Sequence, residues 1–135
     1  MKFIFIIIST LTYSFSYGQS LQFPDAVEKF IGMTEIQQKE YEKTILNEKI
    51  SGGGNIFNVE ECGLFSQSKS FGKKCYEVTV DKGAPRVVLY FSLNEKQKAM
   101  ELRKGNRLDF TNCQIVGIKN WGFWSAVYCD MNFIK

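Results

Sequence analysis

GGGNIFNVEEC (52–62), KCYEVTVDKG (74–83) and PRVVLYFSL (85–93) are three β-type runs that decide the fold together with the segments after them. Those segments are a short helical run, NEKQKAMELR (94–103), and two more β-type runs, NRLDFTNCQIVGI (106–118) and GFWSAVYCD (122–130). The β-type runs are rich in β-branched and aromatic residues, and turn-type residues separate the first three from one another. The sequence therefore predicts the element order β-β-β-α-β-β.

This order is the connectivity of an OB-fold, a small five-stranded Greek-key barrel. We therefore expect a mainly β domain, a five-stranded OB-fold barrel with a short helix between strands 3 and 4. Within the second run, apolar residues at 76, 78 and 80 alternate with polar ones, as in a strand with one buried face. Glycines 52–54 indicate that the first strand bulges and coils sharply. Broken alternation in the fourth strand predicts a bulge near Thr111 and Asn112.

Residues 1–18 have the pattern of a secretory signal peptide. Lys2 precedes an apolar run, FIFIIISTL (3–11), and small residues at Ser16 and Gly18 precede the cleavage site. The apolar run is too short to span a bilayer comfortably. We expect cleavage near Gly18, no membrane association afterwards, and a periplasmic or secreted protein.

Residues 19–48 are predicted to form a helical extension ahead of the barrel, which covers residues 49–135. PDAVEKFI (24–31) reads as a short helix with proline in its first turn and a glycine stop. Thr34 and Gln37 form a capping box, so a second helix is expected from Glu35 to about Asn47. Its thin apolar stripe, Ile36, Tyr41, Ile45 and Leu46, is expected to pack on the outside or one mouth of the barrel, or to bind a partner.

Charge and residue types restrict the function. The chain has 17 basic and 14 acidic residues, and loss of Lys2 with the leader lowers the net charge from +3 to +2. This mild charge disfavours nucleic acid, whose binding domains are usually strongly basic. The chain has no histidine, so few nucleophile–base pairs are available and no catalytic residue is predicted. The carboxylate pairs Glu60–Glu61 and Glu77–Asp81 give no reason for the raised pKa that a general acid needs.

Four cysteines in an exported chain favour disulfides. Cys113 and Cys129 are equidistant from Trp121, so symmetric pairing about the turn KNWGF (119–123) would place them face to face. Cys62 and Cys75 flank the loop between the first two runs. We predict Cys62–Cys75 and Cys113–Cys129. A zinc site would need all four scattered cysteines, so no metal and no cofactor is expected.

KISGGGNIFNV (49–59), CYEVTVD (75–81), PRVVLYF (85–91) and LRKGNRLDFTNCQI (102–115) resemble the tRNA_anti-like group of small exported bacterial OB-fold proteins. The resemblance covers roughly residues 33–130, including the helical TEIQQKEYEKTIL (34–46). Its motifs are structural positions, so it implies an OB-fold but carries over no catalytic residues. The family name implies nucleic acid, and the three glycines and four cysteines depart from the bare pattern.

OB-folds generally bind ligands on the outer face of strands 2 and 3 and with two adjoining loops. Candidate ligand-binding residues there are Thr79, Arg86, Tyr90, Phe71, Lys73, Trp121 and Trp124. Aromatic rings interleaved with basic residues can stack on sugars or bases. The alternative is that Trp121 or Trp124 covers a barrel mouth as core, and that the lysines belong to a solvated loop.

Three functions follow from this reading. The first is a non-enzymatic exported OB-fold protein that binds a protein or glycan. The second is a single-stranded nucleic-acid binder. The third is an interaction protein of the inhibitor, immunity or toxin B-subunit type.

Overall fold

The computed structural model describes residues 21–81 and 85–131, so the predicted signal peptide lies outside the described residues. Its elements in chain order are β1 (Leu21–Gln22), α2 (Asp25–Ile31), α3 (Glu35–Ile45), β2 (Lys49–Glu61), β3 (Cys75–Val80), β4 (Pro85–Ser92), the 3₁₀ turn η1 (Leu93–Glu95), α4 (Lys96–Glu101), β5 (Arg107–Asn120) and β6 (Ser125–Asp130). The five predicted strands and the short helix between the third and fourth are confirmed, and β1 is an additional strand. No helix within the described ranges is long and apolar enough to cross a membrane.

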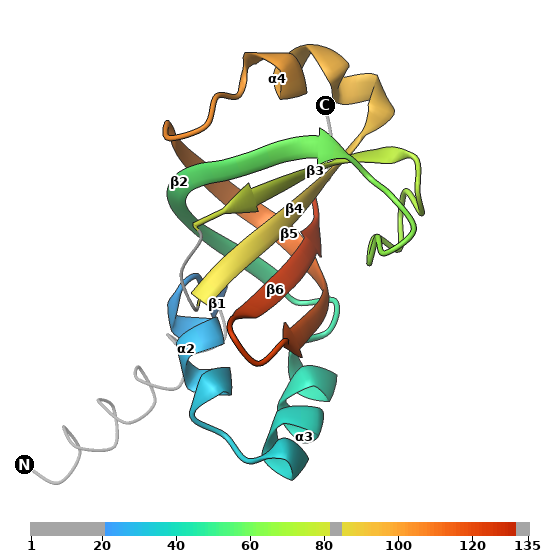
Figure 1. Cartoon of the computed structure of the whole chain (residues 1–135). Helices are drawn as coiled ribbons and strands as arrows, with labels where there is room; N and C mark the ends of the chain where they lie inside the picture. Colours follow the sequence, from blue (N-terminus) through green and yellow to red (C-terminus); the bar gives the residue numbers. More distant parts are fainter. Residues whose placement is uncertain (1–20, 82–84, 132–135) are drawn as a thin grey trace, which may run out of the picture.

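The sheet closes on itself because β2 has two partners. Residues 49–55 of β2 pair with β5, and residues 56–61 pair with β3. β3 continues to β4, β4 pairs with β6 in parallel, and β6 returns to β5. Figure 1 shows β2 bending sharply between its two halves. The protein is therefore mainly β, and its six-stranded sheet forms a ring.

One hydrophobic core fills the ring. Alternate residues of β3, β4 and β6 point inward, and those of the core that are fully buried include Val78, Val80, Val87, Leu89 and Val127. α2 and α3 lie at one end of the ring and α4 at the other (Figure 1). Val27 and Phe30 of α2 and Ile45 of α3 are buried in the same core. The helical extension thus contributes to the core, as the packing interpretation expected.

The helix ends agree with the sequence in part. The capping box is present, since Thr34 Oγ1 accepts from Gln37 N and Gln37 Oε1 accepts from Thr34 N. Ile36, however, is 77% exposed, and within the predicted apolar stripe Tyr41 and Ile45 are the residues that contact the core. Ser92 Oγ accepts from Asn94 N and caps the 3₁₀ turn, so the helical segment begins at Leu93, one residue before the predicted run.

Three β-bulges set the register of the ring. Thr111 and Asn112 of β5 stand opposite Ser51 alone, which confirms the predicted bulge. Asn112 takes a left-handed φ of 55° there. A second bulge on β5 lies at Val116, between the pairs Ile115↔Cys129 and Gly117↔Tyr128. β2 bulges at Phe57 rather than at its glycines.

Both predicted disulfides are present, although the register assumed for one of them was wrong. Cys62 and Cys75 face each other with their Cα atoms 5.3 Å apart. Cys113 and Cys129 are also bonded, with Cα atoms 5.5 Å apart. The turn, however, is centred between Gly122 and Phe123, and Cys129 lies opposite Ile115. The bridge therefore joins diagonal neighbours inside the core.

Gly52 allows close approach of the Phe23 backbone, and Gly53 and Gly54 allow close approach of the Asp109 and Asp81 side chains. A Cβ added at Gly52 would lie 2.7 Å from the carbonyl oxygen of Phe23, and the Phe23 amide donates a hydrogen bond to the carbonyl oxygen of Ser51.

Gly52→Ala should therefore destabilise the protein by about 1–3 kcal/mol, the usual cost of overpacking. Urea unfolding measures this. Gly63→Ala is the control, because a Cβ there meets nothing within 4 Å. Equal stability of the two variants would contradict the close-approach explanation.

Candidate functional site

The outer face of β3, β4 and β6 carries a second buried cluster. Its buried members are Cys75, Val88, Tyr90, Ala126 and Tyr128, and Cys62, Phe71, Val116 and Trp124 pack against it. Side chains alternate along a strand, so these residues point away from the core inside the ring. Such a face needs a cover, because solvent would otherwise contact a large apolar area.

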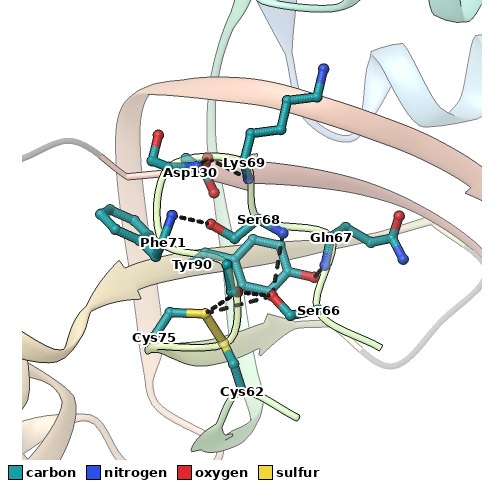
Figure 2. Close-up of a disulfide and its surroundings, with 11 residues drawn as sticks. Cys62, Ser66, Gln67, Ser68, Lys69, Phe71, Cys75, Tyr90 and Asp130 are labelled. Carbon is teal, nitrogen blue, oxygen red and sulfur yellow. Dashed lines mark hydrogen bonds between the residues drawn. A yellow bond between two sulfur atoms is a disulfide. The ribbon is translucent and has the colours of Figure 1, made fainter. Parts of the chain in front are cut away.

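The loop between β2 and β3 supplies part of that cover. Gln67 N donates to the Tyr90 hydroxyl at 3.0 Å, and the amides of Lys69 and Ser70 donate to Asp130 Oδ2 at 3.1 and 2.9 Å. Figure 2 shows the loop held over Tyr90 by these bonds, with the Cys62–Cys75 disulfide at its base. Asp130 is buried, with 2% of its surface exposed. Tyr90 is buried as well, and its burial raises the pKa of its hydroxyl well above the usual range.

The rest of this outer face is an open groove of about 430 Å³. It lies between the β2–β3 loop and the turn that joins β5 to β6. Its lining combines aromatic, polar and charged side chains: Phe57, Asn58, Glu60, Phe65, Gln67, Glu77, Thr79, Arg86, Val88, Trp121, Trp124 and Tyr128. We call it the outer groove.

Aromatic rings and one guanidinium form one side of the outer groove. The Cζ atom of Arg86 lies 4.1 Å from the ring centroid of Trp124 and 5.8 Å from that of Phe57. Trp121 Nε1 donates to the Tyr128 hydroxyl at 2.7 Å, and Trp121 remains 51% exposed. Trp121 is therefore a fixed surface residue of the groove rather than part of the core.

Two carboxylates lie side by side in the outer groove. Glu60 of β2 is the cross-strand partner of Glu77 of β3, and Glu77 is in turn opposite Tyr90. Burial raises the pKa of Glu77 to about 7, and the hydrogen-bonded, like-charged Glu60 adds to the rise, whereas a hydrogen bond with Tyr90 lowers it. The sequence interpretation paired Glu77 with Asp81 and expected no raised pKa. It was wrong because the pairing of β2 with β3 decides Glu77's neighbour.

The structure brings together four of the seven predicted ligand-binding residues. Thr79, Arg86, Trp121 and Trp124 line the outer groove. Tyr90 lies on the predicted face but is covered by the loop. Phe71 is half-buried against the outer cluster, and Lys73 is exposed outside the groove lining.

Sequence reasoning missed other residues that line the outer groove: Phe57, Asn58, Glu60, Phe65, Gln67 and Tyr128. Outward alternation with Ala126 could have indicated Tyr128, but nothing local indicates Phe65.

The described residues offer no group of three or more histidine, cysteine or acidic side chains that could hold a metal ion. All four cysteines are in disulfides. The outer groove can therefore supply hydrogen bonds, aromatic stacking, negative charge from Glu60 and Glu77, and positive charge from Arg86.

No protein-family model matches the chain, and no curated protein is significantly similar to it. The site must be interpreted from its own geometry.

Replacing Glu77 should stabilise the protein only at higher pH. The pKa of Glu77 is about 7 in the folded protein, against an ordinary value of 4.5. The protonated side chain therefore adds to the free energy of unfolding fully below pH 4.5, and this contribution is lost as the pH rises through 7. The full shift corresponds to roughly 3 kcal/mol, and partial exposure reduces this to about 1–2 kcal/mol. Urea unfolding of Glu77→Gln should show that gain at pH 8 and almost none at pH 4. Glu61→Gln, one residue from Glu60 and on the opposite face of β2, is the control. Equal gains at both pH values would exclude the charge explanation.

Asp130 should hold the β2–β3 loop in place. Asp130→Ala removes a buried carboxylate that accepts two amides, so we expect a loss of about 2 kcal/mol in unfolding free energy. Hydrogen exchange of the Lys69 and Ser70 amides should accelerate. Asp109→Ala is the control, since Asp109 forms an exposed pair with Arg107 and should cost less than about 0.5 kcal/mol. Unchanged exchange at Lys69 and Ser70 would refute the proposed anchoring.

Proposed function

We propose that this chain is an exported, non-enzymatic OB-fold protein that binds a protein or glycan ligand in the outer groove. The observation that carries the proposal is the groove itself. It joins aromatic rings, hydrogen-bonding groups and carboxylates in one open space of about 430 Å³. That volume is within the usual range of ligand sites, roughly 300–1,000 Å³, and fits a sugar ring or a few side chains.

The strand order supports an OB-fold. Three strands in antiparallel succession, a short helix, and two further strands that return beside β2 and β4 follow the expected Greek-key path. OB-folds bind ligands on the outer face of their second and third strands, which correspond here to β3 and β4. The outer groove lies over that face.

Two disulfides support export, because such bonds persist in oxidising compartments such as the periplasm or the extracellular space. The carboxylates argue for binding rather than hydrolysis. Glycoside hydrolysis needs two carboxyl groups on either side of a bond, about 5 Å or more apart. Glu60 and Glu77 oppose each other directly on adjacent strands, so they lie side by side and not on either side of a substrate bond. Two carboxylates in the groove also disfavour a phosphate backbone.

Trp121→Ala should weaken the binding of any ligand in the outer groove at least tenfold. The substitution removes an exposed aromatic ring that the hydrogen bond to the Tyr128 hydroxyl holds in place. The probes are a glycan array and a panel of short peptides. Met100→Ala is the control, since Met100 of α4 is also apolar and exposed, at 67%, but does not line the groove. Equal loss in both variants would contradict groove binding. Salt-sensitive retention of the wild-type protein on immobilised single-stranded DNA would favour nucleic acid instead.

A further inference from the structure

We infer that the outer groove binds a basic side chain, arginine or lysine, presented by a protein partner, with the charged group placed over Glu60 and Glu77. This inference rests on the proposed function and names the ligand class. It depends on the geometry of the two carboxylates, on the rings around them and on the apolar surface beyond.

The first argument is charge. Glu60 and Glu77 come from adjacent strands and oppose each other directly on the outer face. Once Glu77 is ionised, the two like charges in direct cross-strand contact are unfavourable, and a cation placed over both would relieve their repulsion. A planar guanidinium can bond to both carboxylates at once. A neutral sugar would leave the repulsion in place.

The second argument is the aromatic surroundings. Phe57, Phe65 and Trp121 line the outer groove and are 45%, 90% and 51% exposed. The faces of aromatic rings attract ammonium and guanidinium groups. The groove already holds one such contact, since the Arg86 guanidinium lies over Trp124. A second cation in the groove could therefore contact the carboxylates of Glu60 and Glu77 and the aromatic rings at the same time.

The third argument distinguishes a protein from a small amine. Leu64 is 78% exposed and Phe123 is 97% exposed. Leu64 directly precedes Phe65 and Phe123 directly precedes Trp124, two residues that line the groove, but neither Leu64 nor Phe123 lines it. A single amine or sugar in the groove would leave these side chains in water. A protein surface could cover them while its basic residue fills the groove, because exposed apolar surface beside a groove marks a protein contact.

The inference also predicts a pH dependence. The charged or titratable groups that face Glu77 are Glu60 from β2, Arg86 and Tyr90 from β4, and Tyr128 from β6, and the loop contributes neutral side chains to the groove. A cation binds the ionised form of Glu77, whose pKa in the free protein is about 7. Affinity should therefore rise about tenfold from pH 6 to pH 8.

The test is an NMR titration of the disulfide-intact, ¹⁵N-labelled protein. The probes are acetyl-Gly-Arg-Gly-amide, the same peptide with neutral citrulline in place of arginine, and cellobiose. We expect the arginine peptide to shift the Glu60 and Glu77 amides and the Trp121 indole, and to bind at least tenfold more tightly than the citrulline peptide. Glu60→Gln and Glu77→Gln should each weaken arginine binding about tenfold at pH 8. Glu61→Gln is the matched control for the same charge change on the opposite strand face, and should leave affinity unchanged.

The other outcomes separate the inference from the proposed function. Equal binding of the arginine and citrulline peptides overturns the inference. Cellobiose binding that is insensitive to Glu60→Gln and Glu77→Gln also overturns it but keeps the outer groove as a glycan site. If no probe shifts any residue of the groove, both the inference and the proposed function fail.

Discussion

The double pairing of β2 is the constraint on which the rest of the structure depends. One strand of 13 residues bonds β5 with its first half and β3 with its second, so the sheet has to bend between Asn55 and Ile56. The glycines before the bend let Phe23 lie against the strand, because any side chain at Gly52 would meet its carbonyl oxygen. Closure in turn defines an inside, filled by the core, and an outside, where the second cluster and the groove lie.

Much of this could be predicted from the sequence, because it depends on local patterns. Alternation marked the strands, Thr34 and Gln37 marked a helix start, and the exported context with four cysteines gave both disulfides. Residue positions on β3 and β4 were also predictable, so Thr79 and Arg86 were found. The register of the last hairpin was not, since a bulge at Val116 and a turn centred past Trp121 shift it by a few residues.

The position of the β2–β3 loop could not be predicted, for a different reason. The polar segment SQSKSFGKK (66–74) resembles a solvated loop. Its anchors are Tyr90 and Asp130, and Asp130 is about 60 residues away along the chain. Only the closed sheet brings them together. The same loop that hides Tyr90 brings Phe65 and Gln67 to the outer groove, so the location of the groove follows from the fold as a whole.

A single extra residue connects the fold to the chemistry of the groove. β2 bulges at Phe57, which shifts the pairing with β3 by one residue, from Ile56↔Val80 to Asn58↔Thr79. Without that shift, Glu60 would stand opposite Tyr76, and Glu77 would be opposite Val59. With it, two carboxylates meet on the outer face, and Phe57 stands out beside them at the groove. A shift of one residue in register normally moves the side chains of a strand to the other face of the sheet. Two opposed acids on the outer face add nothing to the packing of the core. Burial, and then the neighbouring Glu60, raise the pKa of Glu77, and ionisation of Glu77 at neutral pH and above costs stability. Such a cost is typical of sites that recognise a ligand, because the ligand can supply what the free protein lacks.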